Sequence, residues 1–294
     1  MPAVDVLLPY WGDPELLKTA AESVLAQTFT DYKLTVIDDA YPDPEAGRWL
    51  TAMDDPRIEY LRNAENLGVN ANFTKALGLA TAPVFVMMGS DDVMLSNYLE
   101  TVMALMDAFP AAAVVQPGVI PIDSDGIPSR SLPDRIKRLA APKAREARLL
   151  QGEMLAASLL RAGWHYFPSL AWRRDVVIPF GFRPEYDVVQ DLALLLDVAA
   201  SGAGMAVSEE PVFHYRRHAG SDSSQRAHDG RRFNEERRFF AAEADRFAAL
   251  EWPRAARAAR LHWTSRLHAL SVIPGAISSG SFRTVLPLAR HVVH

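Results

Sequence analysis

Two pairs of adjacent aspartates, Asp38-Asp39 and Asp91-Asp92, stand directly after short apolar runs. In an open parallel sheet, ligands bind outside the carboxyl ends of the strands, so both pairs are expected at one edge. Neighbouring carboxylates repel each other unless a cation or hydrogen-bond donors compensate them. Their oxygens suit a hard divalent ion such as Mg²⁺ or Mn²⁺, which also binds phosphate oxygens. Each pair alone would be explained by an ordinary turn, but the repetition favours a site.

The first apolar run is followed by Pro9-Tyr10-Trp11-Gly12-Asp13 rather than by a glycine-rich phosphate loop. This segment matches neither the P-loop nor the dinucleotide fingerprint, which argues against a P-loop NTPase and an NAD-dependent dehydrogenase. A phosphate-bearing ligand would therefore need a metal ion to neutralise its charge.

The elements that must position these acids alternate between strand and helix patterns. Apolar runs predict strands over residues 4–9, 34–37, 57–61, 84–88 and 113–115. Asp13-Pro14 is typical of a helix start, and helical spacing of apolar residues extends to about Gln27. Further helices are expected over residues 70–79 and 96–109. This alternation predicts an α/β fold with a doubly wound parallel sheet.

The composition is that of an ordinary globular protein. The chain has 294 residues, of which 49% are hydrophobic, and a formal net charge of -5. That charge gives no reason to expect nucleic acid as a partner. The absence of cysteine excludes disulfides and a thiol nucleophile, and fits a reducing compartment. No secretory signal pattern and no apolar run of about 18 residues is evident, so we expect a cytoplasmic protein.

Seven short motifs, in order, resemble those of family-2 glycosyltransferases with the GT-A fold. They are VLLPY at 6–10, AESVLAQT at 21–28, VIDD at 36–39, NLGVNAN at 66–72, GSDD at 89–92, QD at 190–191 and YRRHAGS at 215–221. Any one of them would be a weak signal, but together they cover roughly residues 3 to 224. The resemblance implies a Rossmann-like GT-A fold with a mostly parallel central sheet and a C-terminal helical extension. The catalytic domain would span residues 1–225, with a nucleotide-binding half (1–120) and an acceptor half (121–225), followed by helices over 226–294.

The resemblance also implies roles for individual residues. It assigns the nucleotide-sugar donor to Pro9, Tyr10, Asp38, Asp39, Asn66, Gly68, Asn72, Ser90, Asp91 and Asp92. A carboxylate that accepts from a uracil or thymine N–H would make Asp39 a sensible base contact. The divalent metal, Mn²⁺ or Mg²⁺, would be held by Asp91, Asp92 and His218. Asp191 would be the catalytic base.

Three positions depart from the family pattern. Gly89 and Gln190 stand where acidic residues are common, and Ala71 replaces a commonly basic residue. Without acids at these positions, Asp91 and Asp92 must hold the metal with phosphate and water, and Asp191 is the single proton acceptor of its motif. These departures motivate an alternative, a non-catalytic scaffold that binds nucleotide-sugars. A nucleotidylyltransferase is disfavoured because its glycine- and arginine-rich loop is missing after the first strand.

The implied activity is inverting transfer of a sugar from a UDP- or dTDP-sugar to a hydroxyl of a glycan, lipid-linked saccharide or natural product. Simpler explanations exist for several residues. Asp191 could be an ordinary first-turn helix acid, and His218 a surface histidine. The aromatic cluster at 164–166 could be core, or it could contact the acceptor.

Two basic regions complete the sequence. The segment 129–150 is typical of a solvated loop or helix. The region after Arg231 combines arginines with aromatic residues on helical patterns. Such helices could pack on the catalytic domain, or they could contact an anionic membrane at the inner face of the cell.

Overall fold

The first half of the chain folds as the strand and helix alternation predicts. Its parallel strands lie in the order β3-β2-β1-β4. The strands are β1 (Val4–Tyr10), β2 (Tyr32–Asp38), β3 (Ile58–Arg62) and β4 (Val84–Met87), and the helices are α1 (Pro14–Leu25), α2 (Glu45–Ala52), α3 (Val69–Gly78) and α4 (Tyr98–Ala108). Asp13 caps α1 as predicted, since its carboxylate accepts from the Glu15 N–H at 2.9 Å. Helix α2 was not predicted.

The computed structural model describes residues 1–129, 131–217, 231–278, 286, 288, 289 and 291. Within these residues the second half adds strands to the same sheet, which continues in the order β8-β6-β9-β5, with β7 paired to β9. The added strands are β5 (Val93–Met94), β6 (Ala112–Ile122), β7 (Arg148–Gln151), β8 (Ala171–Arg173) and β9 (Gly204–Arg216). Because β8 runs antiparallel to both β4 and β6, the sheet is parallel in its first half and mixed in its second. The domain boundary expected at 120/121 falls inside β6 and remains a prediction.

Each face of the sheet carries its own hydrophobic core, as side-chain alternation along a strand requires. In β1, Val6 and Leu8 face a core shared with α1 and α4. Leu7 faces the other core, which contains side chains of α3, α6 (Gly152–Ala162) and α8 (Gln190–Ala200). Both faces are therefore covered, and the edge at the carboxyl ends of β1, β2 and β4 is left for a site.

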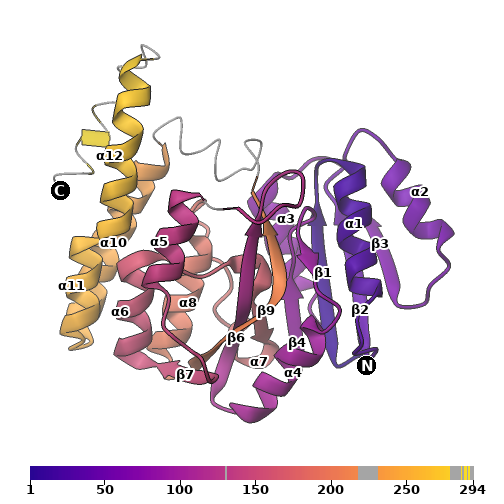
Figure 1. Ribbon diagram of the computed structural model, residues 1–294, viewed down its shortest axis with the longest axis horizontal. Helices are drawn as coiled ribbons and strands as arrows, with labels where there is room; N and C mark the ends of the chain where they lie inside the picture. The colour runs from indigo at the N-terminus through magenta and orange to yellow at the C-terminus, as the bar shows by residue number, and fades with distance from the viewer. Residues whose placement is uncertain (130, 218–230, 279–285, 287, 290, 292–294) are drawn as a thin grey trace.

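The C-terminal helices form a further layer outside α6 and α8. They are α10 (Arg231–Ala249), α11 (Pro253–Leu261) and α12 (Trp263–Ser278). Figure 1 shows them at the opposite end of the molecule from β3 and α2. Phe239 and Phe247 are fully buried in the same core as α6 and α8. The aromatic residues of α10 therefore pack on the preceding α/β part of the chain, as one of the two explanations for their pattern expected.

The basic segment 129–150 contains α5 (Leu132–Ala140) and β7. Ser131 caps α5 by accepting from the Asp134 N–H at 3.3 Å, and Pro133 lies in the first turn. Residues 131–150 thus form a helix, a loop and a strand, and several of their side chains line a cavity described below.

Candidate functional site

The parallel strands bring the predicted acids to one edge of the sheet. Tyr10 ends β1 and Asp38 ends β2, and the Asp39 N–H donates to the Tyr10 carbonyl at 2.9 Å. The second acid pair follows β4, which pairs in parallel with β1. Both pairs thus lie at the carboxyl ends of neighbouring parallel strands, where ligands bind in open α/β sheets.

The Asp39 carboxylate is buried, with 1% exposure, and holds a loop. One of its oxygens accepts from the Asn63 amide at 2.6 Å and from the Leu67 N–H at 2.8 Å. The other oxygen accepts from the Gly68 N–H at 2.9 Å. Gly68 has a φ of +84°, a conformation that side chains rarely adopt. Asp39 therefore fixes the loop that leads into α3, and its contact with a nucleotide base remains a prediction.

Asp38 is also fully buried, and both of its carboxylate oxygens accept hydrogen bonds. Its Oδ1 accepts from the Tyr41 N–H at 2.8 Å, and its Oδ2 accepts from the Tyr60 hydroxyl and the Arg62 guanidinium. Burial raises the pKa of Tyr60, and the Asp38 hydrogen bond adds to this effect. Asp38 thus joins the ends of β2 and β3.

An aromatic group lies beside Asp38. Tyr10 has no exposure and donates its hydroxyl to the Gly12 carbonyl at 2.9 Å, while Pro9 is buried within β1. Trp11 is 47% exposed, and its ring centroid lies 5.3 Å from that of Tyr41. The exposed ring at this edge is therefore Trp11, to which the sequence motifs had assigned no role.

The asparagines of the NLGVNAN motif, residues 66–72, differ in exposure. Asn72 is buried, donates to the Ile37 carbonyl at 3.0 Å and accepts from Asn63 at 3.1 Å. It therefore ties α3 to β2. Asn66 is exposed on the loop held by Asp39. Of these two predicted donor contacts, only Asn66 presents its side chain to solvent.

The second acid pair differs in its electrostatics. Asp92 is 1% exposed, and its Oδ1 accepts from the Arg216 N–H at 2.8 Å. Burial raises the pKa of Asp92 well above its ordinary value, and the charge of Asp91 raises it further. The Arg216 guanidinium donates to the backbone carbonyl of Asp91 at 2.8 Å rather than to either carboxylate. The two negative charges of the pair therefore repel each other beside a buried carboxylate.

Both carboxylates of this pair crowd the backbone at Gly89. A Cβ at Gly89 would lie 2.6 Å from Asp92 Oδ2 and 2.9 Å from Asp91 Oδ1, too close for a side chain to fit without a shift. Two carboxylate oxygens that approach the same point repel each other, and such a pair fits a hard divalent cation. Ser90 lies half-buried between Gly89 and the pair.

A complete protein ligand set is not present in the part of the chain that the structure describes. No group of three or more histidine, aspartate or glutamate side chains there could hold a metal ion. His218, the predicted third ligand, lies outside the described residues. Asp91 and Asp92 are thus the two described groups of the predicted metal site, and donor phosphates would supply further oxygens.

Asp191 lies in the first turn of α8, as its sequence context predicted. Its Oδ2 lies 3.1 Å from His165 Nε2, and its Oδ1 accepts from the Leu192 N–H at 2.7 Å. Burial raises the pKa of Asp191, but His165, Leu192 and Lys137 outweigh burial and hold the pKa below its ordinary value. The side chain is 28% exposed. An ionised, oriented and accessible carboxylate is what a general base requires.

Asn70 connects α3 to the start of α8. Its amide donates to the Asp187 carboxylate at 2.6 Å, and its oxygen accepts from the Gln190 amide at 2.9 Å. Asn70 belongs to the first turn of α3, directly after Gly68 and the loop that Asp39 holds. Gln190 stands where family members commonly have an acidic residue. Its hydrogen bond to Asn70 joins α3 to the start of α8, next to Asp191.

Glu235 of α10 supports the same helix end. Its Oε1 accepts from three successive backbone N–H groups, those of Asp187, Val188 and Val189, at 3.0, 2.6 and 3.1 Å. These donors immediately precede α8, and Glu235 is 8% exposed. The C-terminal helices therefore help to place Asp191. No local sequence signal identifies Glu235, because its partners lie more than 40 residues away.

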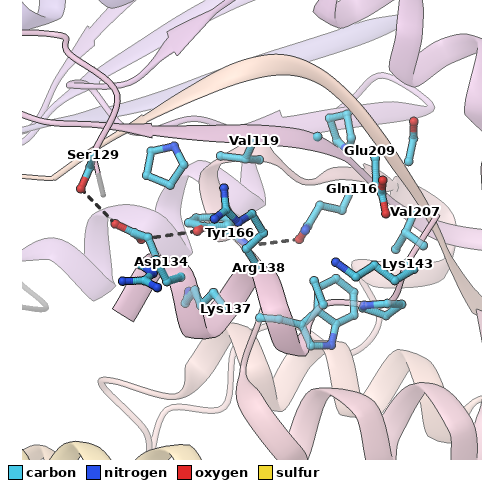
Figure 2. Close-up of a pocket in the computed structure, with 18 residues that line it drawn as sticks. Gln116, Val119, Ser129, Asp134, Lys137, Arg138, Lys143, Tyr166, Val207 and Glu209 are labelled. Carbon is cyan, nitrogen blue, oxygen red and sulfur yellow. Dashed lines mark hydrogen bonds between the residues drawn. The ribbon is translucent and has the colours of Figure 1, made fainter. Parts of the chain in front are cut away.

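A cavity of about 790 Å³ lies between α5 and the strands β6 and β9. Trp164 and Tyr166 line it, together with basic side chains of α5 (Figure 2). His165 stands between these two aromatic residues and contacts Asp191. The cluster at 164–166 is thus buried, and it also borders a cavity near the candidate base.

Comparisons with known proteins agree with this arrangement. The sequence model of the family described as glycosyl transferase family 2 matches residues 5–174. A GalNAc(5)-diNAcBac-PP-undecaprenol beta-1,3-glucosyltransferase of Campylobacter jejuni is 31% identical over 35% of this chain and 34% of that protein. A UDP-Glc:alpha-D-GlcNAc-diphosphoundecaprenol beta-1,3-glucosyltransferase, WfgD of Escherichia coli, is 28% identical over 35% and 40%. This chain thus spans well under half the length of these relatives.

Among solved structures, residues 1–349 of S. aureus TarS superpose with a TM-score of 0.68 at 12% identity, over 98% of this chain and 80% of that one. TarS in complex with UDP-GlcNAc gives a TM-score of 0.63 at 14% identity, over 81% and 65%. At these identities the likeness concerns the fold, which is the GT-A-like arrangement that the motifs predicted.

Proposed function

Because the chain belongs to glycosyl transferase family 2 and is a glycosyltransferase, we propose that it moves a sugar from a UDP-sugar to a hydroxyl group of a lipid-linked saccharide with inversion. Relatives whose names specify diphosphoundecaprenol-linked acceptors support this acceptor class. The TarS complex with UDP-GlcNAc supports a UDP donor over a dTDP donor.

The observation that carries the proposal is the environment of Asp191. The carboxylate is ionised at neutral pH, held by His165 at 3.1 Å and partly open to solvent. In a single displacement, the acceptor oxygen bonds to the anomeric carbon while the bond from that carbon to the diphosphate breaks. The hydroxyl proton passes to the Asp191 carboxylate, and the nucleoside diphosphate leaves with the bonding electrons. Inversion follows from this one-step geometry.

The donor side of the site would be formed by the two acid pairs and Trp11. The exposed Trp11 ring suits stacking on a nucleotide base. Members of this family typically depend on divalent metal, and Asp91 and Asp92 would hold the cation, with His218 as a third ligand. A bound cation supplies positive charge against the diphosphate of the leaving group. The remaining contacts of Asn66 and Ser90 would orient the donor.

Substitution Asp191→Asn tests the proposal. Asparagine keeps the size and one hydrogen-bond acceptor but cannot take a proton, so turnover should fall about 10²–10⁴-fold. UDP affinity, measured by calorimetry with Mn²⁺, should stay within about twofold because the donor is bound elsewhere. The exposed Asp175 provides the matched control Asp175→Asn, which should retain full turnover. If Asp191→Asn retains more than about a tenth of wild-type turnover, Asp191 is not the general base, and Asp187 becomes the next candidate.

Among the described residues, no helix is long and apolar enough to cross a membrane. We further propose that this cytoplasmic enzyme contacts the inner face of the membrane through α12. Support comes from Trp263, Leu267 and Leu270, which follow one helical face and are each more than half exposed. The wild-type protein should float with anionic liposomes, and the triple variant Trp263→Ser, Leu267→Ser, Leu270→Ser should not. Equal flotation of wild type and variant would contradict this contact.

A further inference from the structure

The cavity between α5 and the sheet carries an excess of positive charge. Arg135, Lys137 and Arg138 project from α5 toward it, and Lys143 follows on the next loop. In the described part of the chain, no carboxylate lies within salt-bridge distance of the Arg135, Arg138 or Lys143 side chain. Four cations in one cavity repel each other, which favours an anionic ligand.

The two acids of the cavity do not neutralise these cations. The Asp134 carboxylate accepts from Arg217 Nε at 2.7 Å, and from the Tyr166 hydroxyl at 3.4 Å. Arg217 lies outside the cavity lining, so Asp134 is committed to a neighbour. Glu209 accepts from the Ala144 N–H at 2.7 Å. Both acids are thus occupied by other partners, and Figure 2 shows the hydrogen bonds that Asp134 accepts from Ser129 and Tyr166.

The surroundings of Lys137 also indicate an excess of positive charge in the cavity. Its ammonium donates to the His165 carbonyl at 2.8 Å and lies 4.6 Å from the centre of the Tyr166 ring. Burial lowers the pKa of Lys137 to about 8, and the charge of Arg217 contributes. An anion bound here would compensate this charge, since a nearby opposite charge stabilises an ammonium group.

The cavity lies near the candidate base, since the charge of its lining residue Lys137 acts on Asp191. Trp164 and Tyr166 line it, and the intervening His165 contacts Asp191 at 3.1 Å. A ligand that fills the cavity would therefore approach the carboxylate that receives the acceptor proton. The donor acids lie instead at the carboxyl ends of β2 and β4, so this cavity is separate from the predicted donor site.

We propose that this cavity binds a phosphate ester of the acceptor, next to the sugar whose hydroxyl reacts. Arginine side chains suit phosphate because their planar donors pair with two of its oxygens. The Tyr166 ring, which lines the cavity, would border the attached sugar. The assignment rests on the proposed function, because it makes Asp191 the base for the bound acceptor.

Calorimetry with N-acetylglucosamine 1-phosphate as the probe tests the assignment, in the presence and absence of UDP and Mn²⁺. Arg138→Glu should weaken binding by at least about tenfold, the typical value of a hydrogen bond to a charged group. Arg145→Glu is the matched control, since Arg145 is exposed in the same segment and does not line the cavity. It should change the affinity by less than about twofold, as expected for a distant, screened charge. N-acetylglucosamine without phosphate should bind more weakly than the probe.

The outcomes separate this assignment from the proposed function. Equal losses in Arg138→Glu and Arg145→Glu would overturn it, because general electrostatic attraction would then explain binding. Inorganic pyrophosphate that binds as tightly as the sugar phosphate, with the same loss in Arg138→Glu, would indicate a site for a free anion and would also overturn it. Failure of UDP to bind any variant would instead contradict the donor half of the proposed function.

Discussion

The pairs Asp38-Asp39 and Asp91-Asp92 look equivalent in the sequence and differ in the structure. Each pair follows a parallel strand, and Asp38, Asp39 and Asp92 are almost fully buried. The oxygens of the first pair accept hydrogen bonds from backbone and side-chain donors of the loops that follow β2 and β3. In the second pair, Asp92 accepts from the Arg216 N–H, lies beside the negative charge of Asp91 and has a raised pKa.

The difference lies in what compensates the negative charge. A buried carboxylate is stable only when donors, cations or protons offset its loss of hydration. The first pair receives this compensation from the protein and therefore fixes the shape of the site. In the second pair, burial and the charge of Asp91 raise the pKa of Asp92, and both carboxylates approach the same point beside Gly89. The first pair thus holds structure, and metal binding by the second remains a prediction.

The largest expected effect is on metal-dependent nucleotide binding. Asp92→Asn should lower the affinity for UDP in the presence of Mn²⁺ by at least about a hundredfold. Loss of a residue that only hydrogen-bonds to a metal ligand costs about 10–100-fold, and loss of the ligand itself should cost more. Stability should not fall, because asparagine still accepts from Arg216 and removes a charge repulsion. Calorimetry and urea unfolding measure the two effects. The exposed Asp125 gives the control Asp125→Asn, and UDP binding that survives in Asp92→Asn would remove the second pair from the metal site.

The first pair should respond in the opposite way. Asp39→Asn leaves the Gly68 N–H or the Leu67 N–H facing an amide donor, which should cost about 1–3 kcal/mol of unfolding free energy. Urea unfolding measures the change against Asp31→Asn, an exposed control. Unchanged stability together with lost UDP binding would reverse the comparison. Asp39 would then be the base contact that the family resemblance implies.

The smallest expected effect is a pH dependence of stability in EDTA. The folded-state pKa of Asp92 lies above its ordinary value of 3.8, so the folded protein binds more protons than the unfolded chain between the two values. The Asp92 contribution to stability therefore falls as the pH rises above 3.8 toward the folded pKa. Thermal unfolding across this range should show a shallower decline for Asp92→Asn. A decline identical to that of wild type would show that Asp92 is compensated after all.

Local patterns determined most of the first half of the fold. Apolar runs, Asp13 with Pro14, and helical spacing predicted β1, α1, β2, β3, α3, β4 and α4 to within a few residues. These signals are local, because strand alternation and helix capping depend on residues only a few positions apart. Helix α2 lacked a strong apolar pattern, and the two-residue β5 is too short for one. The antiparallel β8 had no signal of direction in its sequence.

Local patterns also located the aspartates along the fold, but they did not show what each carboxylate does. Parallel strands put both pairs at one edge whatever surrounds them, and the first turn of α8 at Asp191 followed from its apolar spacing. The family resemblance supplied the implied roles. The donor set around Asp39, the burial of Asp92 and the crowding at Gly89 depend on which loops meet at that edge, and no periodicity encodes this.

The sequence by itself thus determined most elements of the first half, the edge where the two acid pairs lie, and the family. Only the tertiary structure decided that Glu235 supports α8, that His165 orients Asp191, and that the basic residues of α5 share a cavity with Trp164. The physical reason is sequence separation. These contacts join residues 26 to 46 positions apart or lie between separate elements, and chain folding brings them together through packing of the two cores rather than through local preference.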